Sequence, residues 1–303
     1  MKKTALYVFF FLVLGTALGA LYYTQRHEKQ ANVSANAILE IAADTQRDLS
    51  RAPMRLTRLS DEEEIAIGRE LAARYDSQQK ELTPEEQALS AYIQRVGRTV
   101  AAHAHRRLPY SFHLVPDRNL INAFSLPGGP VYIGEGMLGE LMTEDELAGL
   151  LAHELEHVDH YHCVERVQIE TNLKRLNLQV LGDVVKLPLE LWQTGYHKDE
   201  ELEADREGMF LAVRAGYSPY GQLELFQRLA KLNSEYIIHA ETPEEELSAL
   251  AIESLSGYFR SHPRTSERIA QAEQIIAEQH WEDKKETKPF RSEYQVHHGQ
   301  YMK

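Results

Sequence analysis

Residues 153–157 read His-Glu-Leu-Glu-His and lie in an apolar stretch that begins after Thr143. Thr143 followed by Glu146 is a helix-capping pattern, and the leucines that follow recur at helical spacing. The stretch therefore predicts a capped helix with two histidines four positions apart. Residues at this spacing are neighbours on one helix face, so the two imidazoles can hold a single Zn²⁺.

Glu154 lies beside this histidine pair and completes the pattern H-E-x-x-H. A carboxylate in this position can take a proton from a water molecule whose pKa is lowered by the metal. The competing interpretation is a solvated helix face with incidental histidines. The apolar surroundings favour the metal site, because charged residues are normally excluded from such a stretch.

A catalytic zinc site needs a third protein ligand and a position open to water. Downstream, Glu201 and Asp205 stand four residues apart in a second predicted helix and therefore share a face. Glu201 can be the third ligand, and Asp205 can accept the remaining N–H of a ligand histidine. Acidic runs are usually solvated, but the apolar residues over 209–213 indicate that one face of this helix is buried.

The rest of the chain predicts a mainly helical α+β fold with a small sheet beside the H-E-x-x-H helix. Helical patterns run over residues 59–102, with capping signals at Ser60 and Thr83. Alternation over Tyr110–Val115 predicts a strand. Asn122–Ile133 predicts two short extended pieces joined by a tight turn at the Pro-Gly-Gly-Pro centre. After this the pattern is again mainly helical.

Five segments resemble, in order, the M48 family of zinc metallopeptidases, specifically its periplasmic quality-control and Oma1-like branch. The resemblance covers about residues 60–275 and implies a zincin-like metallopeptidase fold. The segments are Glu64–Ala72, similar to the family's opening helix; Asn122–Gly129, similar to its N-A-F-x-x-P-G-G element; His153–His157; Glu201 with Asp205, its E-x-x-x-D pair; and Ser261–Arg264 with Arg268 and Ile269, similar to its late histidine segment.

The resemblance implies a role for each residue of the site. Glu154 would be the general base, and Asp205 would support a ligand histidine from behind. His262 would act near the metal, either stabilising the transition state or serving as a reversible blocking ligand. One Zn²⁺ per chain would be bound by three ligands, His153, His157 and Glu201.

The resemblance also places a sheet edge beside the cleft. An edge strand can bind an extended peptide through main-chain hydrogen bonds, which gives broad specificity for segments unfolded enough to enter. The substrate-binding residues implied in this way are Asn122, Ala123, Phe124, Gly128 and Gly129.

Glu156 departs from the family, which usually has a small residue at this position. A carboxylate there is expected to crowd the cleft or to add negative charge near the metal, with consequences for substrate preference. His160 and His162 follow on the same predicted helix. They are interpreted as auxiliary ligands or, more simply, as surface or packing histidines.

The composition of the 303-residue chain bounds its partners. A net charge of -13 argues against nucleic acid, and the single cysteine, Cys163, excludes an intramolecular disulfide. Lys2 and Lys3 precede an apolar run, Thr4–Tyr23, that is long enough to span a bilayer. This run predicts an uncleaved membrane anchor or a cleaved signal peptide.

We therefore expect four parts: an anchor or signal peptide over residues 1–23, a linker over 24–58, an M48-like peptidase domain over 59–280 and a polar, mobile tail over 281–303. The two lysines place the N-terminus in the cytoplasm and the body outside it. The expected location is the bacterial inner membrane with a periplasmic catalytic domain. The alternative is a soluble periplasmic protein after signal cleavage.

These features together predict a zinc endopeptidase that cleaves unfolded or misassembled polypeptides outside the cytoplasm. The alternative of another class is a chaperone or assembly factor with a latent zinc site, in which His262 acts as a fourth ligand. A purely structural zinc would need a closed site with four ligands. A prenyl-protein protease of the Ste24 type would need many membrane helices, and the sequence predicts one at most.

Overall fold

The computed structural model describes residues 59–77, 79–166, 196–235, 262 and 265–290. The predicted N-terminal membrane segment at 1–23 and the linker after it lie outside these residues. Among the helices that the structure describes, none is long and apolar enough to cross a membrane.

Three short strands form the sheet: β1 (Ser111–Val115), β2 (Ala123–Ser125) and β3 (Pro130–Gly134). β3 lies in the centre, parallel to β1 and antiparallel to β2. The turn between β2 and β3 contains Gly128 and Gly129 with φ angles of 77° and 122°, a region that glycine enters without steric cost. The predicted strand and the predicted pair of extended pieces are thus confirmed, and β2 forms one edge of the sheet.

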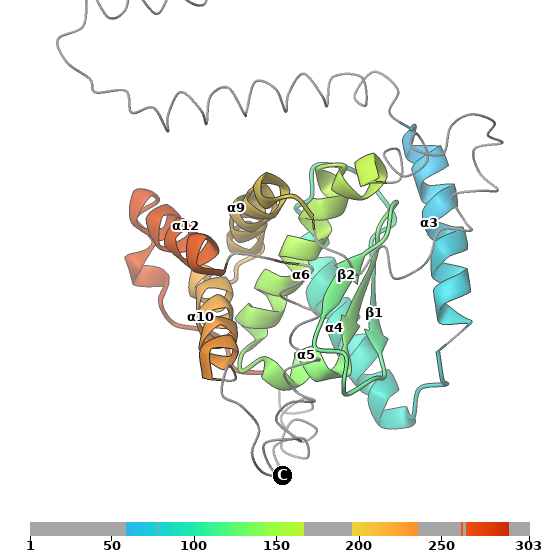
Figure 1. The fold of residues 1–303 in the computed structure, drawn as a ribbon, viewed down its shortest axis with the longest axis horizontal. Helices are drawn as coiled ribbons and strands as arrows, with labels where there is room; N and C mark the ends of the chain where they lie inside the picture. The colour runs from blue at the N-terminus through green and yellow to red at the C-terminus, as the bar shows by residue number, and fades with distance from the viewer. Residues whose placement is uncertain (1–58, 78, 167–195, 236–261, 263–264, 291–303) are drawn as a thin grey trace, which may run out of the picture. The chain divides into compact units, whose positions relative to one another are not determined.

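Helices cover both faces of this sheet, with α3 (Asp61–Asp76) on one side and α4 (Pro84–Ala101) and α6 (Glu144–Asp159) on the other (Figure 1). The predicted capping boxes at Ser60 and Thr83 are both present and begin α3 and α4. The fold is therefore mainly helical with a small sheet, as the sequence predicts.

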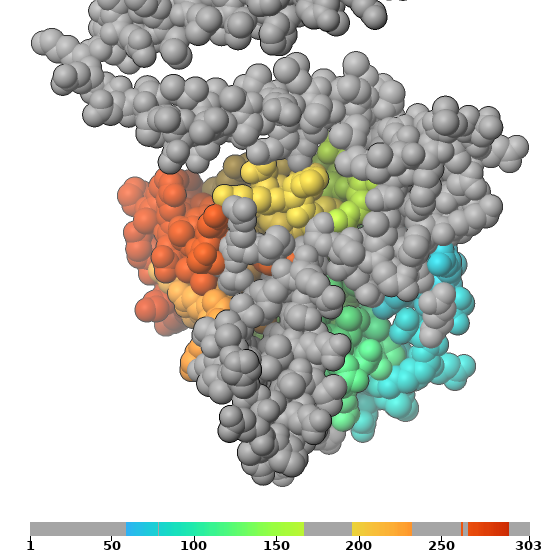
Figure 2. Space-filling view, in the orientation of Figure 1, coloured from blue at the N-terminus to red at the C-terminus, as the bar shows by residue number. Residues whose placement is uncertain are grey.

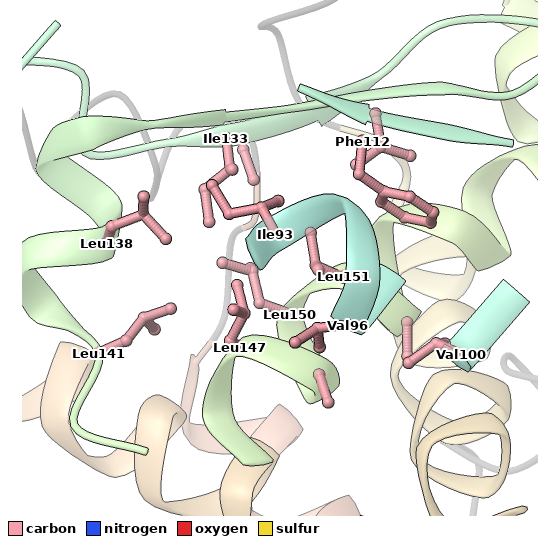
Figure 3. Packing of buried hydrophobic residues seen from close by; sticks show 14 of the residues in the cluster. Ile93, Val96, Val100, Phe112, Ile133, Leu138, Leu141, Leu147, Leu150 and Leu151 are labelled. Atoms are coloured by element: carbon pink, nitrogen blue, oxygen red, sulfur yellow. The ribbon is translucent and has the colours of Figure 1, made fainter. Parts of the chain in front are cut away.

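The main core lies between α4, α6 and the inner face of the sheet. Figure 3 shows leucines of α6 directed toward Ile93 and Val96 of α4. Phe112 and Ile133 of the sheet complete the same cluster. A short helix, α5 (Glu135–Glu140), joins β3 to α6 and adds Leu138 to the same cluster. Burial of these side chains holds α6 in a fixed place relative to the sheet.

All residues of α6 are buried, so the helix runs through the centre of the domain. Thr143 accepts a hydrogen bond from the Glu146 N–H at 3.2 Å, as a cap should. The Glu146 carboxylate does not complete the predicted capping box. It accepts instead from the Met142 N–H at 2.6 Å and binds Arg228 at 2.7 Å, because a buried carboxylate gains more from a cation than from a second main-chain donor.

Three further helices pack beside α6: α9 (Lys198–Arg214), α10 (Pro219–Glu235) and α12 (Thr265–Glu278). α9 approaches α6 closely at Gly208, where an added Cβ would lie 3.0 Å from the main-chain nitrogen of His153. In Figure 2 the surfaces of α9 and α12 adjoin each other on the side of the molecule opposite α3. This packing brings the predicted acidic helix against the H-E-x-x-H helix.

The predicted tail beginning at residue 281 starts too early, because residues 281–290 belong to the body. They include a 3-10 turn, Glu282–Lys284, and a β-bridge between Thr143 and Pro289. The Glu144 N–H donates to the Lys288 carbonyl at 2.9 Å, and Phe290 joins the main core with 4% of its surface exposed. Polar composition concealed one buried aromatic residue that anchors the segment.

Candidate metal centre

Four buried side chains converge where α6 and α9 face each other. His153 and His157 come from α6, Glu201 comes from α9, and His262 comes from the segment before α12. One ligand atom of each residue lies within 4.8 Å of the corresponding atom in the others. The structure therefore brings together the three predicted ligands and His262, although these residues are spread over more than a hundred positions of the chain.

The spacing of these atoms fits ligands that share one ion. The Nε2 atoms of His153 and His157 are 3.2 Å apart. The carboxylate of Glu201 lies 3.5 Å from Nε2 of His157 and 3.6 Å from Nε2 of His153. Two ligand atoms at zinc bond lengths and a tetrahedral angle are roughly 3.3 Å apart, so the observed separations correspond to neighbouring corners of one coordination sphere.

The protonation of the cluster also fits a metal. Burial, together with the neighbouring His153 and His162, lowers the pKa of His157 well below its usual value, which favours the neutral imidazole that metals bind. Burial raises the pKa of Glu201, but the nearby His262 and His153 outweigh it and the net shift is downward. Oε1 of Glu201 has no hydrogen-bond partner among the described residues. Two neutral nitrogens and one anionic oxygen are a donor set that divalent transition ions accept.

Glu154 lies next to the cluster and is completely buried. Its Oε1 lies 3.4 Å from Nε2 of His262, and its Oε2 accepts a hydrogen bond from the Ser125 hydroxyl at 3.3 Å. Burial raises the pKa of Glu154 above its usual value, although His262 and His153 oppose this shift. A carboxylate with a raised pKa is a better proton acceptor than an exposed one.

Asp205 lies behind His153, as the spacing in α9 indicates. Its Oδ1 is 2.8 Å from Nδ1 of His153, the ring nitrogen that does not face the other ligands. Burial raises the pKa of Asp205, but Arg268 and His153 outweigh it and lower the value to about 2. Arg268 of α12 binds both carboxylate oxygens, at 2.6 Å and 2.7 Å. Arg268 belongs to the segment that resembles the late histidine segment of the M48 family, but the sequence did not indicate its contact with Asp205.

His157 has two further partners, His162, which the sequence suggested as an auxiliary ligand or packing residue, and Tyr196, which it did not suggest. Its Nδ1 lies 3.0 Å from Nδ1 of His162, and its ring stacks on Tyr196 with centroids 3.8 Å apart. Ser125, which contacts Glu154, was likewise not suggested by the sequence. Only the tertiary fold brings these residues to the site, so no spacing in the sequence could have revealed Ser125 or Tyr196.

The structure turns Glu156 away from the cluster. Its carboxylate lies 3.2 Å from Nε2 of His160, in a separate group, so the expectation that it crowds the metal is wrong for this conformation. His160 and His162 also do not continue α6. The helix ends at Asp159, and Tyr161 has a φ of 66°, which reverses the chain before His162.

The residues of the predicted substrate-binding element have their side chains in the core or in the turn. The ring of Phe124 stacks on Tyr132 with centroids 5.2 Å apart. The N–H of Gly128 donates to the Glu64 carboxylate at 2.9 Å. The side-chain oxygen of Asn122 accepts a hydrogen bond from the Ala123 N–H at 3.0 Å. Any contact between this element and a peptide would therefore involve the main chain of β2.

The part of the chain that contains the metal-ligand cluster is similar in sequence to known proteins. The pattern of the family described as Peptidase family M48 matches residues 87–276. The chain is 30% identical over 168 residues to a beta-barrel assembly-enhancing protease of Yersinia pestis, covering 49% of this chain and 34% of that protein. It is 27% identical over 206 residues to the mitochondrial metalloendopeptidase OMA1 of Schizosaccharomyces pombe, covering 65% and 56%. It is 26% identical over 214 residues to the metalloprotease LoiP of Escherichia coli, covering 66% and 79%. The matched region is thus only about a third of the length of the Yersinia protein.

Proposed function

The chain belongs to peptidase family M48, and we propose on this basis that it is a zinc-dependent endopeptidase that cleaves unfolded or misassembled proteins outside the cytoplasm. The observation that carries the proposal is the convergence of His153, His157 and Glu201 at ligand spacing, with the Glu154 carboxylate beside them. Relatives named as a metalloendopeptidase and as an assembly-enhancing protease support the same class of activity.

His153, His157 and Glu201 would hold the metal, which when bound would polarise the scissile carbonyl and make a water molecule more acidic. Glu154 would accept the proton of that water and deliver it to the leaving amine. Its position supports this role, because it is buried next to the ligands and its pKa is raised. The Ser125 hydroxyl, at 3.3 Å from Oε2, would keep this carboxylate oriented.

Asp205 and Arg268 would fix the state of His153. Nδ1 of this imidazole lies 2.8 Å from Oδ1 of Asp205, so its N–H would donate to the carboxylate and leave the Nε2 lone pair toward the other ligands. Arg268 keeps the Asp205 carboxylate ionised and in place. The tautomer and orientation of His153 would therefore be set by α9 and α12.

The main chain of β2 would bind the substrate as an added strand. The Asn122 carbonyl accepts from the Gly134 N–H, and the Leu126 N–H donates to the Pro130 carbonyl. The alternation along β2 therefore directs the main-chain groups of Ala123 and Ser125 away from β3. A peptide paired there would lie beside Glu154, which Ser125 contacts. Main-chain recognition requires an extended segment, which supports unfolded protein as the substrate class.

The predicted membrane segment over residues 1–23 would tether the domain to the bacterial inner membrane on its periplasmic side, or would be removed to give a soluble periplasmic enzyme. Membrane-associated or misassembled polypeptides would then be the available substrates. This part of the proposal depends on the sequence pattern of the N-terminus alone.

His262 favours a second candidate, a chaperone or assembly factor with a latent zinc site. Its Nδ1 lies 2.9 Å from Glu201 and 3.2 Å from Nε2 of His153, so its ring faces the same point as the ligands. A fourth protein ligand would occupy the position that water needs. In an active enzyme the same imidazole would instead face the reacting carbonyl.

The decisive experiment compares the purified full chain with the Glu154→Gln variant in detergent. Zinc per chain is measured by elemental analysis, and cleavage of unfolded casein is followed by gel. The expected result is one bound zinc at the cluster in both proteins, similar melting temperatures, and a loss of cleavage of at least 100-fold in the variant, as for removal of a general base. Absence of zinc from the wild type would refute the proposal.

The His262→Ala variant separates the two candidates. If His262 stabilises the reaction, this variant cleaves casein more slowly than the wild type. If His262 blocks the metal, the wild type is inactive and the variant gains activity that the double variant with Glu154→Gln lacks.

A further inference from the structure

We propose a second metal site at the C-terminal end of α6, where His105, Glu156 and His160 would bind a divalent transition ion of the zinc class. One ligand atom from each of these residues lies within 4.8 Å of the others. The group is distinct from the cluster of His153 and His157, because the two share no residue and Glu156 contacts His160 instead. Its residues play no part in the proposed peptide hydrolysis.

The strongest indication is the carboxylate of Glu156. The residue has no exposed surface, and both of its oxygens lack a hydrogen-bond partner at good geometry among the described residues. A buried carboxylate is costly unless a cation compensates it. The nearest candidate is the imidazole of His160, whose Nε2 lies 3.2 Å from Oε2. Each of these atoms is a metal ligand type, and both point into the same space.

His105 is held in position independently of any metal. The carboxylate of Asp159 accepts from the main-chain N–H groups of His105 and Arg106, both at 2.8 Å, and its Oδ2 lies 3.2 Å from Nδ1 of the His105 ring. Tyr110 donates to the same carboxylate at 2.8 Å. The loop after α4 is therefore fixed to the last turn of α6, which keeps the imidazole of His105 next to that of His160.

His160 is oriented from its other nitrogen. Its Nδ1 lies 3.4 Å from Oε1 of Glu203 on α9, while its Nε2 faces Glu156. A histidine that binds a metal through one ring nitrogen usually donates its other ring N–H to a carboxylate. His160 is also the residue at which α6 ends, and the following Tyr161 turns the chain away. The ring is therefore held by both α6 and α9.

The donor set selects the kind of ion. Two imidazoles and one carboxylate suit Zn²⁺, Co²⁺ or Ni²⁺, whereas Mg²⁺ and Ca²⁺ prefer oxygen ligands throughout. The side chain of His105 is 61% exposed and that of His160 is 26% exposed, so an ion can enter from solvent and keep water in a remaining position. A bound ion would join the loop after α4 to α6 and, through Glu203, to α9.

The test is a Co²⁺ titration of the full chain after removal of all metal, followed by visible absorption and by elemental analysis. The wild type is expected to bind two equivalents. The His105→Ala and His160→Gln variants are expected to bind one equivalent and to lose the second absorption component. The Glu201→Gln variant, which is altered only in the first cluster, is expected to keep the component that those two variants lose.

Two controls separate this site from adventitious binding. His103 is an exposed histidine of the same loop, and the His103→Ala variant should still bind two equivalents. The double variant with His297→Ala and His298→Ala should do the same, which excludes the histidine pair near the end of the sequence. Saturation of the wild type at one equivalent, or an unchanged second equivalent in His105→Ala and His160→Gln, would overturn the proposal. Either result is independent of casein cleavage, so it leaves the proposed peptidase activity to its own test.

Discussion

Arg268 binds Asp205 through two contacts, 2.6 Å from Nε to Oδ2 and 2.7 Å from a terminal nitrogen to Oδ1. Asp205 in turn lies 2.8 Å from Nδ1 of His153. The three residues belong to α12, α9 and α6, so the orientation of one candidate ligand depends on the packing of three helices. Arg268 is also 1% exposed and lies over the ring of Phe226, so its charge is buried.

Replacing Arg268 should therefore impair both stability and metal binding. The Arg268→Ala change removes the cationic partner of the buried Asp205 carboxylate, and breaking a buried ion pair in this way costs about 3–5 kcal/mol. Loss of support for His153 should also weaken zinc binding about 10–100-fold. Urea unfolding and zinc competition with a chelator measure the two effects.

The matched control is Arg206→Ala on α9. Arg206 pairs with Glu207 at 2.9 Å, but its side chain is 47% exposed. An exposed pair of this kind contributes about 0–1 kcal/mol, so both measurements should stay near the wild-type values. Equal losses in the two variants would contradict the role assigned to Arg268.

His160 gives the metal-free protein a specific pH dependence. The close carboxylates of Glu156 and Glu203, opposed by burial, raise the pKa of His160 to about 10. The unfolded value is about 6.5, so the folded state holds this proton more tightly. The resulting stability is complete below about pH 6.5 and is lost as the pH rises through about 10.

Urea unfolding of the chelator-treated protein between pH 6 and pH 10 measures this contribution. The His160→Gln variant has no imidazole to titrate, so its stability should fall less over this range than that of the wild type. The expected difference is on the order of 2 kcal/mol, because each pKa unit corresponds to about 1.4 kcal/mol and solvent screens part of the interaction. Parallel pH profiles for the two proteins would show that His160 carries no stabilising charge.

The sequence predicts those parts of the site that are local. The spacing of His153 and His157 and that of Glu201 and Asp205 are properties of single helices, so a one-turn interval was enough to pair them. The position of His262 followed only from the resemblance, because a histidine before a proline has no distinctive local pattern. In the structure it joins the other ligands, which no periodicity in its own segment indicates.

The parts that the sequence did not predict depend on tertiary packing. The direction of Glu156 is an example: helical spacing placed it on a flank of α6, but its carboxylate lies against His160, whose other ring nitrogen is held by Glu203 of α9. Glu146 likewise satisfies the capping pattern in sequence, yet it binds Arg228, which lies 82 residues further along the chain. In both cases a residue of another helix, Glu203 of α9 or Arg228 of α10, contributes to the final arrangement.

Close contact between α3 and the turn after β2 makes Gly68 intolerant of a side chain. A Cβ at this position would lie 1.8 Å from the Pro127 carbonyl oxygen, a main-chain atom that cannot move alone. Gly68→Ala should therefore destabilise the protein by about 1–3 kcal/mol or more, despite the better helix propensity of alanine. Chemical unfolding with the melting temperature as a second readout measures this cost.

Gly139→Ala provides the comparison, because no atom of the described residues lies within 4 Å of where a Cβ would stand at Gly139 in α5. That change should be neutral or stabilising by up to about 1 kcal/mol. If both substitutions had the same effect, the close contact between α3 and Pro127 would not be what excludes a side chain at Gly68.

Phe290 should be required for full stability even though it lies in a segment of polar composition. Its ring packs in the main core beside Tyr92, with centroids 6.4 Å apart, and the adjoining β-bridge at Thr143 fixes the segment to the beginning of α6. Phe290→Ala should lower the free energy of unfolding by about 3–5 kcal/mol through lost burial and the cavity that remains.

The control is Met142→Ala. Met142 is 48% exposed, so this change should alter the free energy of unfolding by no more than about 0.5 kcal/mol. A Phe290→Ala variant as stable as Met142→Ala would mean that residues 281–290 are dispensable for the domain, as the composition of the segment suggests.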